Sequence, residues 1–370
     1  MKVGIPREVK NNEFRVAITP AGVHELVRYG HEVLVEQNAG VGSSITDDEY
    51  VAAGAKILRT ADEVWATADL LLKVKEPIAE EYHRLRKDQT LFTYLHLAAS
   101  RECTDALLES GTTAIAYETV EVNRALPLLA PMSEVAGRLA PQVGAYHLMR
   151  SAGGRGVLPG GVPGTQPGRA VVIGGGVSGW NATQIAVGMG FHVTLLDRDI
   201  NKLREADKVF GTKVQTIVSN AFELEKAVVE ADLVIGAVLI PGAKAPKLVT
   251  NELVAKMKPG SVLVDIAIDQ GGCFEDSRPT THAEPTFNVH NSVFYCVANM
   301  PGAVPNTSTY ALTNATLPYI VSLANNGWVE ALRRDPALAM GLNTHDGKVV
   351  YREVAEAHGL ESIELSALLA

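Results

Sequence analysis

Three residues in the first third of the chain carry side chains suited to binding and protonating a small anion. Arg15 offers a planar guanidinium that can grip a carboxylate at two points, Lys75 is a compact cation, and His96 exchanges protons near neutral pH. Each follows a segment that reads as a strand, and parallel sheets place functional residues beyond the carboxyl ends of their strands. Each alone could equally be an exposed Arg, an exposed Lys or a capping His. The three together favour a site for a small anion.

The strand before Lys75 carries a second candidate cation. Lys73 lies two residues earlier and therefore on the same face, since side chains alternate along a strand. The pattern of residues does not choose between the two lysines.

A glycine-rich turn in the middle of the chain is typical of dinucleotide binding. The apolar run Ala170–Ile173 reads as a buried strand and leads into Gly174, Gly176 and Gly179, which form G-x-G-x-x-G ahead of a helix expected over Ser178–Val187. Such glycines permit a tight bend, a close approach of the backbone to a pyrophosphate, and close packing of helix on strand. The helix N-terminus then offers N–H groups to the phosphates. This context favours a Rossmann dinucleotide site over a purely structural turn.

An acid follows at the spacing that ribose recognition requires. His192–Leu196 reads as the next parallel strand, and Asp197 at its end lies roughly 20 residues beyond the glycines. Its carboxylate can accept hydrogen bonds from the ribose hydroxyls and would repel a 2′-phosphate, so NAD is favoured over NADP. The neighbouring Arg198 could soften that preference.

A later strand offers two acids for chemistry. Asp265 lies inside the strand expected at Val262–Ile266, where a buried acid is costly unless it is paired. Asp269 lies beyond the strand, just before Gly271-Gly272. Asp269 is therefore the better candidate.

The composition excludes several classes of protein. Of the 370 residues, 46% are hydrophobic and 20% are charged, which is typical of a soluble globular chain long enough for two domains. A net charge of −9 without basic runs argues against nucleic-acid binding, and no apolar stretch is long enough for a signal peptide or a membrane span. The 3 cysteines lack C-x-x-C spacing, so we expect reduced thiols in a cytoplasmic protein.

The order of expected elements predicts two α/β domains, each a Rossmann-like, doubly wound parallel sheet, with a cleft between them. Residues 1–128 and 309–370 form the first domain, and residues 129–308 form the second. Strands of the first are expected at Lys2–Ile5, Glu32–Val35, Lys56–Leu58, Leu70–Val74, Thr90–Leu95 and Thr113–Ala116. Its helices are expected at Pro20–Tyr29, Asp47–Ala53, Ala61–Ala66, Ala79–Leu85 and Arg101–Glu109. Further strands of the second are expected at Val214–Val218, Leu233–Val238, Thr286–Val289 and Phe294–Val297.

Three segments connect these elements. A helix is expected from Ala130 to about Arg150, with Ser133 as its N-cap and a bend at Pro141. Ser151–Gly168, rich in glycine and proline, reads as an ordered linker rather than a flexible lid. A helical run from Thr309, interrupted at Pro318, then returns the chain to the first domain.

Several motifs together resemble the alanine dehydrogenase family, which includes bacterial L-alanine dehydrogenases and the NAD-binding subunit of proton-translocating transhydrogenase. Besides the glycine turn, the motifs are G-I-P-R-E-V-K-N-N-E-F-R-V-A-I-T-P at 4–20, L-L-K-V-K-E-P at 71–77, L-H-L-A-A at 95–99, L-A-P-M-S-E-V-A-G-R at 129–138, G-A-V-L-I-P-G-A-K-A-P at 236–246 and V-D-I-A-I-D-Q-G-G at 264–272. The resemblance runs from end to end. The first and last of these motifs are far more specific than the glycines.

The resemblance implies a role for each candidate. Substrate carboxylate would bind Arg15 and Lys75, which resolves the choice of lysine by likeness, and His96 and Asp269 would be the catalytic pair. The implied NAD contacts are Ser133, Gly174, Gly176, Val177, Ser178, Gly179, Asp197, Lys202, Ser219, Val238, Leu239, Ile266, Ala267, Ile268, Asp269, Arg278, Val297, Ala298, Asn299 and Met300.

The implied reaction is the reversible, NAD-dependent oxidative deamination of L-alanine to pyruvate and ammonium, in a homohexamer. Some family members bind a divalent metal in the C-terminal helix, but residues 323–327 offer only amides here, so we expect no metal. A transhydrogenase hydride carrier, a saccharopine- or lysine-type dehydrogenase with a roomier pocket and a non-catalytic NADH sensor are the alternatives. The presence of Lys75, His96 and Asp269 disfavours the carrier, and a sensor would need no proton carrier.

Overall fold

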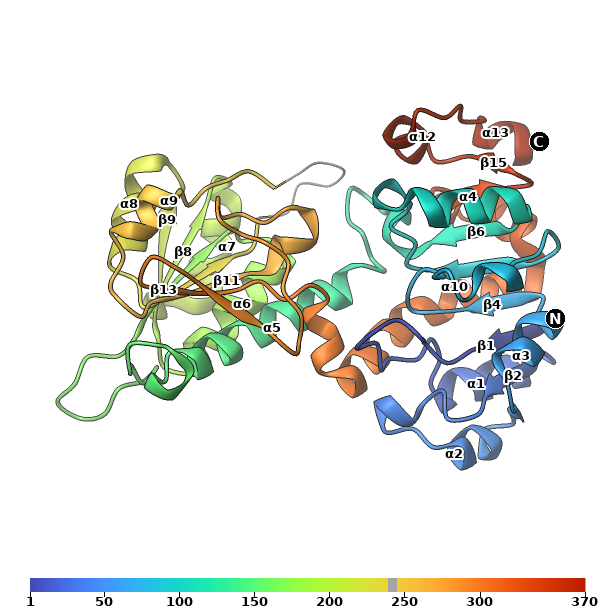
Figure 1. The fold of residues 1–370 in the computed structure, drawn as a ribbon, viewed down its shortest axis with the longest axis horizontal. Helices are drawn as coiled ribbons and strands as arrows, with labels where there is room; N and C mark the ends of the chain where they lie inside the picture. The colour runs from blue at the N-terminus through green and yellow to red at the C-terminus, as the bar shows by residue number, and fades with distance from the viewer. Residues whose placement is uncertain (239–244, 370) are drawn as a thin grey trace. The chain divides into compact units, whose positions relative to one another are not determined.

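The computed structural model describes residues 1–238 and 245–369. The chain divides into two compact units, residues 1–132 with 304–370 and residues 133–303 (Figure 1). Their junctions lie a few residues from those expected after 128 and 308. Which unit binds substrate and which binds the dinucleotide stays a prediction, as does the cleft. Within the described residues, every helix is too short or too polar to span a bilayer.

The first unit is built on an 8-stranded sheet with the order β15-β14-β6-β5-β4-β1-β2-β3. Its strands are β1 (Lys2–Ile5), β2 (Glu32–Glu36), β3 (Lys56–Leu58), β4 (Leu70–Leu72), β5 (Thr90–Thr93), β6 (Thr113–Ala116), β14 (Leu342–His345) and β15 (Lys348–Val349). Its helices are α1 (Pro20–Arg28), α2 (Asp47–Ala52), α3 (Ala61–Thr67), α4 (Arg101–Ser110), α10 (Pro305–Arg334), α11 (Pro336–Ala339), α12 (Arg352–His358) and α13 (Leu365–Leu369). The strands β1 to β6 are mutually parallel, as predicted.

The second unit has a 7-stranded sheet with the order β12-β13-β11-β10-β7-β8-β9. Its strands are β7 (Arg169–Ile173), β8 (His192–Asp197), β9 (Val214–Val218), β10 (Leu233–Gly236), β11 (Val262–Asp265), β12 (Thr286–Val289) and β13 (Ser292–Tyr295). Its helices are α5 (Ala130–His147), which begins at the end of the first unit, α6 (Val177–Gly188), α7 (Ile200–Phe210), α8 (Ala221–Val229) and α9 (Asn251–Ala255). Without β12, the order is that of dinucleotide-binding folds, with β7 as the first strand.

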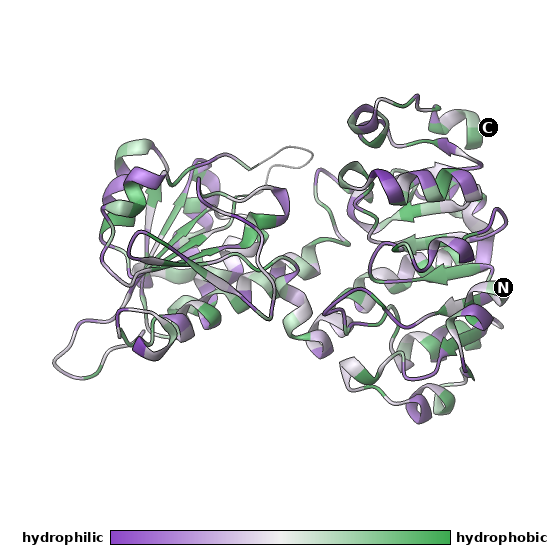
Figure 2. Cartoon of the chain, viewed as in Figure 1, coloured by the Kyte–Doolittle hydropathy of each residue, from purple (hydrophilic) through white to green (hydrophobic). Residues whose placement is uncertain are grey.

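The strands of the second sheet are buried on both faces because successive apolar residues point to opposite sides. Ala170 and Val172 pack with α5, α6 and α7, whereas Val171 and Ile173 pack with α8 and α9. In the first unit, α3, α4 and α12 pack on one face of the sheet through Trp65, among others. Figure 2 shows hydrophobic residues along the strands of both sheets. Two Rossmann-like α/β domains, each doubly wound, are therefore confirmed.

Both sheets end in antiparallel strands that we did not expect. In the second unit, β12 pairs antiparallel with β13. Only His290 and Asn291 separate the two strands, and a parallel pair would need a long crossover. In the first unit, β14 and β15 add an antiparallel edge beside β6.

Three expected helical features were wrong. Residues 79–85 form only a short 3₁₀ turn (Tyr82–Arg84), because the Glu81 carboxylate accepts from Ile78 N–H and pairs with Lys73. Ser133 lies inside α5 and is not its N-cap. In α10 the backbone departs from helical geometry at Gly327 (φ 73°), and Pro318 lies within the helix.

Candidate active site

Three candidate side chains follow neighbouring strands of the first sheet. Arg15 comes after β1, Lys75 after β4 and His96 after β5, and the sheet order is β5-β4-β1. Because these strands are parallel, their carboxyl ends meet at one edge of the sheet. Strand order also reverses between β1 and β4, and α/β sheets bind ligands at such a point. The topology therefore brings all three residues to the same edge.

Arg15 is buried and is already held by a carboxylate. Its Nε donates to Glu13 Oε1 at 2.7 Å and its Nη2 donates to Glu13 Oε2 at 2.6 Å. Its Nη1 lies 3.0 Å from the Met132 sulfur. Arg15 thus makes a bidentate contact to Glu13 through its Nε–Nη2 edge, the kind of contact that we expected it to make to a substrate carboxylate.

Lys73 belongs to a buried ion-pair cluster. Its Nζ lies 3.0 Å from Glu8 Oε2 and 2.9 Å from Glu81 Oε1, and its side chain is fully buried. Burial alone would lower the pKa of Lys73, but the two carboxylates raise it above its ordinary value. Lys73 therefore has a structural role, and Lys75, which is half-buried, stays the candidate for the site.

His96 lies in a strained turn held by its neighbours. Its backbone is left-handed (φ 50°, ψ 35°), which costs a residue with a side chain about 1–2 kcal/mol. The Glu118 carboxylate accepts the N–H groups of Leu95 at 3.1 Å and of His96 at 2.6 Å. The His96 ring stacks on Tyr94, with centroids 5.9 Å apart and planes 4° apart. Strain of this kind clusters at functional sites.

Electrostatic effects connect these side chains. Burial raises the pKa of Glu76, but Lys75, Lys10 and His96 together bring it below its ordinary value. Lys75 and His96 therefore lie near one carboxylate. Burial also raises the pKa of Tyr94, and Arg15 opposes this shift. Glu76 thus interacts with Lys75 and His96, and Tyr94 interacts with Arg15.

The glycine turn of the second unit has a geometry that requires glycine. Gly174 has a φ of +100°, and a Cβ there would lie 2.9 Å from the Ala237 carbonyl oxygen. A Cβ on Gly179 would lie 1.7 Å from the Gly174 carbonyl oxygen, so α6 packs against the turn only because this residue is glycine. Gly176 is the N-cap of α6 and has no side chain to accept from the first N–H groups of the helix. Those N–H groups are the donors that bind phosphate in such turns.

Asp197 lies at the end of β8 and helps to hold this turn. Its Oδ2 accepts from Gly175 N–H at 2.6 Å, and its Oδ1 accepts from Asp199 N–H at 2.8 Å. Lys202 Nζ lies 3.5 Å from the same Oδ2, and Arg198 is exposed. A carboxylate has about four acceptor positions, so Asp197 retains capacity for ribose hydroxyls.

The two acids at and beyond the end of β11 have different environments. Asp265 is fully buried and accepts from the N–H groups of Ala267, Cys273 and Phe274 and from the Ser277 hydroxyl. Burial raises the pKa of Asp265, and these four donors oppose the shift. Asp269 lies in the 3₁₀ helix η7 (Ile266–Gln270) and is exposed. Asp265 therefore organises the loop, and Asp269 is the acid that solvent reaches.

The other predicted cofactor contacts lie mainly beyond strand ends of the second sheet. By position they are Ser219 after β9, Val238 after β10, Ile266, Ala267 and Ile268 in η7, Val297, Ala298, Asn299 and Met300 after β13, Val177 and Ser178 in the first turn of α6, and Ser133 in α5. Arg278 stacks over the Phe287 ring at 4.3 Å. Leu239 lies outside the described residues.

Sequence reasoning missed the carboxylates that hold the site. Glu13 fixes the Arg15 side chain, and Glu118 fixes the His96 turn. Glu8 accepts from Val74 N–H at 2.6 Å, directly before Lys75. Glu8 and Glu118 contact segments that are distant in the sequence, so only the fold reveals these contacts. Glu13 lies two residues from Arg15, and that spacing could have suggested an ion pair.

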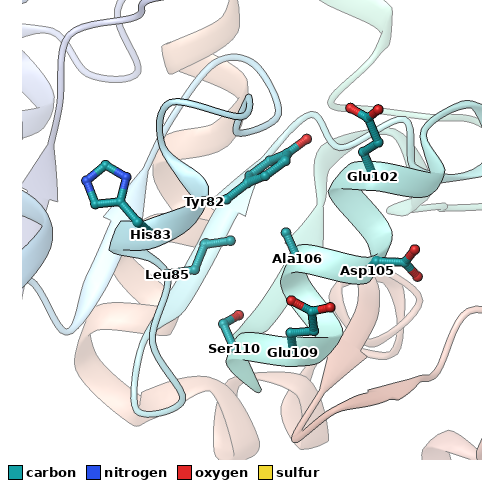
Figure 3. A pocket seen from close by; sticks show the side chains of 8 residues that line it. All are labelled: Tyr82, His83, Leu85, Glu102, Asp105, Ala106, Glu109 and Ser110. Carbon is teal, nitrogen blue, oxygen red and sulfur yellow. The ribbon is translucent and has the colours of Figure 1, made fainter.

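A surface pocket of the first unit, with a volume of about 660 Å³, is separate from these residues. Tyr82, His83 and Leu85 line one side, and the carboxylates of Glu102, Asp105 and Glu109 extend from α4 on the other (Figure 3). Its negative charge would repel a carboxylate substrate. Over the described ranges, we find no group of three or more His, Cys, Asp or Glu side chains that could hold a metal ion.

Comparisons with known proteins cover the whole chain. The N-terminal domain model of the family "Alanine dehydrogenase/PNT" matches residues 4–136, and the C-terminal domain model matches residues 140–352. The chain is 67% identical to an alanine dehydrogenase of Mycolicibacterium smegmatis over 100% of both proteins.

Two solved structures are similar. One is an L-alanine dehydrogenase at 52% identity, with a TM-score of 0.95 over 97% of this chain and 99% of that one. The other is a transhydrogenase from Sinorhizobium meliloti at 27% identity, with a TM-score of 0.84 over 95% and 100%. The chain therefore belongs to the alanine dehydrogenase/PNT family.

Proposed function

We propose that this chain catalyses the reversible reaction L-alanine + NAD⁺ + H₂O ⇌ pyruvate + NH₄⁺ + NADH + H⁺. The observation that carries the proposal is the full-length similarity to alanine dehydrogenases, in both family domains. The array of Arg15, Lys75 and His96 at one sheet edge is the local support, because a transhydrogenase carrier needs no amino-acid site.

Arg15 and Lys75 would bind the substrate carboxylate. The Arg15 guanidinium, whose plane Glu13 fixes, would donate to one carboxylate oxygen. Lys75 would supply a second positive charge. Holding the carboxylate in this way orients the α-carbon, and orientation supplies a large part of the rate enhancement in such reactions.

His96 and Asp269 would act on the intermediates, His96 by proton transfer and Asp269 through its charge. Loss of hydride from Cα leaves an iminium, to which water adds. His96 would take the proton from that water and later return it as the carbinolamine collapses to pyruvate and ammonium. Asp269 would stabilise the cationic intermediates and orient water or ammonia.

The second unit fits a dinucleotide. The turn before α6 contains three glycines, Gly174, Gly176 and Gly179, and no side chain caps the first N–H groups of the helix. Asp197 accepts a hydrogen bond from this turn. NAD⁺ bound there would accept the hydride. We assign residues 129–308 to cofactor binding and residues 1–128 with 309–370 to substrate binding, with the remaining contacts as predicted from the sequence.

Two wider properties belong to the same proposal. We propose a homohexamer, which light scattering coupled to size-exclusion chromatography would test. We also propose a cytoplasmic protein, a view that the three free, buried cysteines support.

The decisive experiment is the absorbance of the reduced nicotinamide with purified protein, NADH, pyruvate and ammonium at mildly alkaline pH. We expect rapid loss of NADH that requires ammonium, and slower loss with NADPH. Loss without ammonium would indicate a 2-oxoacid reductase. NADH binding without turnover would instead indicate a hydride carrier or a sensor.

A further inference from the structure

We propose that Glu118 is the positioning residue for His96, and that it acts through its charge as well as its hydrogen bonds. This inference rests on the proposed function, in which His96 carries the proton. Glu118 lies in the 3₁₀ helix η4 (Tyr117–Thr119), directly after β6. Strands β5 and β6 pair as far as Thr93 and Ala116, so the segments that follow them leave the sheet at the same level. This pairing brings Glu118 close to His96.

Glu118 restrains the backbone on which His96 stands. Both of its oxygens accept the N–H of Leu95, at 3.1 and 3.2 Å, and Oε1 also accepts the N–H of His96 at 2.6 Å. A left-handed residue that is not glycine persists only when its surroundings hold it. The carboxylate supplies that restraint, so His96 projects from a rigid turn.

The same carboxylate faces the imidazole. Glu118 Oε1 lies 3.8 Å from His96 Nδ1, too far for a hydrogen bond but close enough for an ion pair once the ring is protonated. The His96 side chain is 42% exposed and that of Glu118 is 16% exposed, so the acid is the more buried of the two. Tyr94 stacks on the ring face. The ring is thus oriented by its stacking on Tyr94 and by the turn that Glu118 holds, and the carboxylate adds a nearby negative charge rather than a hydrogen bond to the ring.

The consequence concerns the protonated state that His96 must reach during turnover. Lys75 and Lys10 are cations near the same edge, and both lower the pKa of the Glu76 carboxyl against the effect of its burial. Glu76 and Glu118 are the nearby acids, but Lys10 already pairs with Glu76. Glu118, with Oε1 3.8 Å from Nδ1, would offset the positive charge that the His96 ring gains when it accepts a proton.

The test is Glu118→Gln, which keeps an oxygen that can accept both N–H groups but removes the charge. We expect kcat for pyruvate amination to fall about tenfold or more, with the KM for pyruvate and the Kd for NADH changed by less than about twofold. Glu121→Gln, three residues along the chain, is the matched control and should behave like the unmodified protein.

A double-mutant cycle separates positioning from general structural damage. If Glu118 acts through His96, Glu118→Gln should cause no further loss in the His96→Ala background, measured as single-turnover NADH oxidation. Equal losses in both backgrounds would overturn the proposal, and so would a kcat within about twofold of the unmodified protein. An inactive unmodified protein would instead reject the proposed function.

A second variant covers the case in which Glu118→Gln does not fold, as judged by circular dichroism and NADH binding. Glu118→Asp keeps the charge but withdraws it by one methylene. A fall in kcat at constant KM supports the proposal, and an unchanged kcat overturns it.

Discussion

Glu13 occupies the Nε–Nη2 edge of the Arg15 guanidinium at 2.7 and 2.6 Å, and both side chains are almost fully buried. The arginine is thus oriented before any substrate arrives, and its charge is partly balanced. Such preorganisation reduces the entropy cost of binding.

The first prediction tests this orientation with Arg15→Lys. Lysine keeps the charge but has no planar fork, so it cannot both satisfy Glu13 and present a fixed donor to the substrate. We expect the KM for pyruvate to rise on the order of 10-fold, since a hydrogen bond to a charged group contributes about 1.5–3 kcal/mol. Initial rates at varied pyruvate would measure this. Arg28→Lys, an exposed pair with Glu25, is the control, and an unchanged KM for Arg15→Lys would remove Arg15 from the carboxylate site.

The second prediction concerns the catalytic pair. His96→Ala and Asp269→Asn should each lower kcat by about 10²–10⁴, the range that general acid–base groups contribute. NADH binding, followed by fluorescence, should persist. His83→Ala and Asp207→Asn, which lie on the surface, serve as controls. Near-normal turnover in either site variant would reject the role proposed for that residue.

The third prediction is a pH-dependent stability defect in Lys73→Met. Removing the cation leaves Glu8 and Glu81 buried with backbone N–H donors but without a positive charge, which should cost about 3–5 kcal/mol at neutral pH. Burial raises the pKa of Glu8, and Lys73 opposes that shift, so the variant should raise this pKa further. The folded variant then holds a proton that the unfolded chain releases, and its stability falls as pH rises.

Urea denaturation at pH 5.5 and pH 8 would measure that defect, which should be larger at pH 8. Lys56→Met removes an exposed pair with Glu32 and should have little effect at either pH. A defect that is equal at both pH values would argue against buried carboxylates as its cause.

The fourth prediction compares two glycines of α6. Gly179→Ala would place a Cβ within 1.7 Å of a backbone oxygen, so the helix or the turn must move. We expect a loss of about 1–3 kcal/mol in stability and a clear weakening of NADH binding. In Gly188→Ala, no described neighbour outside the helix lies within 4 Å of the new atom, and stability should rise by up to about 1 kcal/mol. Thermal unfolding and NADH titration would measure both, and equal behaviour of the two variants would contradict the packing argument.

Local patterns predicted most of the fold. Buried strands such as Ala170–Ile173 and Thr113–Ala116 are short apolar runs, and their signal does not depend on distant residues. The errors arose where a tertiary contact decided the local structure. The turn at 79–85 is set by the pairing of Glu81 with Lys73, and β14 is defined by its partner β6.

The same distinction between local patterns and tertiary contacts applies to the candidate site. Strand ends made Arg15, Lys75 and His96 visible because their positions follow from sheet topology. The residue pattern left Lys73 and Lys75 open and the family resemblance favoured Lys75; the structure adds the physical reason, since Lys73 is buried between two carboxylates. Glu118 could not be found from spacing, since 22 residues separate it from His96 and only the alignment of β5 with β6 joins them.

The pairing of β14 with β6 has a consequence for biosynthesis. As the chain emerges from the ribosome, β6 is complete long before Leu342–His345 appears, and the intervening residues 133–303 form a compact unit of their own. The backbone N–H and C=O groups on the outer edge of β6 therefore stay unpaired while the whole second unit is translated. Nascent chains stalled between residues 120 and 340 should be vulnerable to aggregation through that edge, and a chaperone that covers it would raise the yield of native protein.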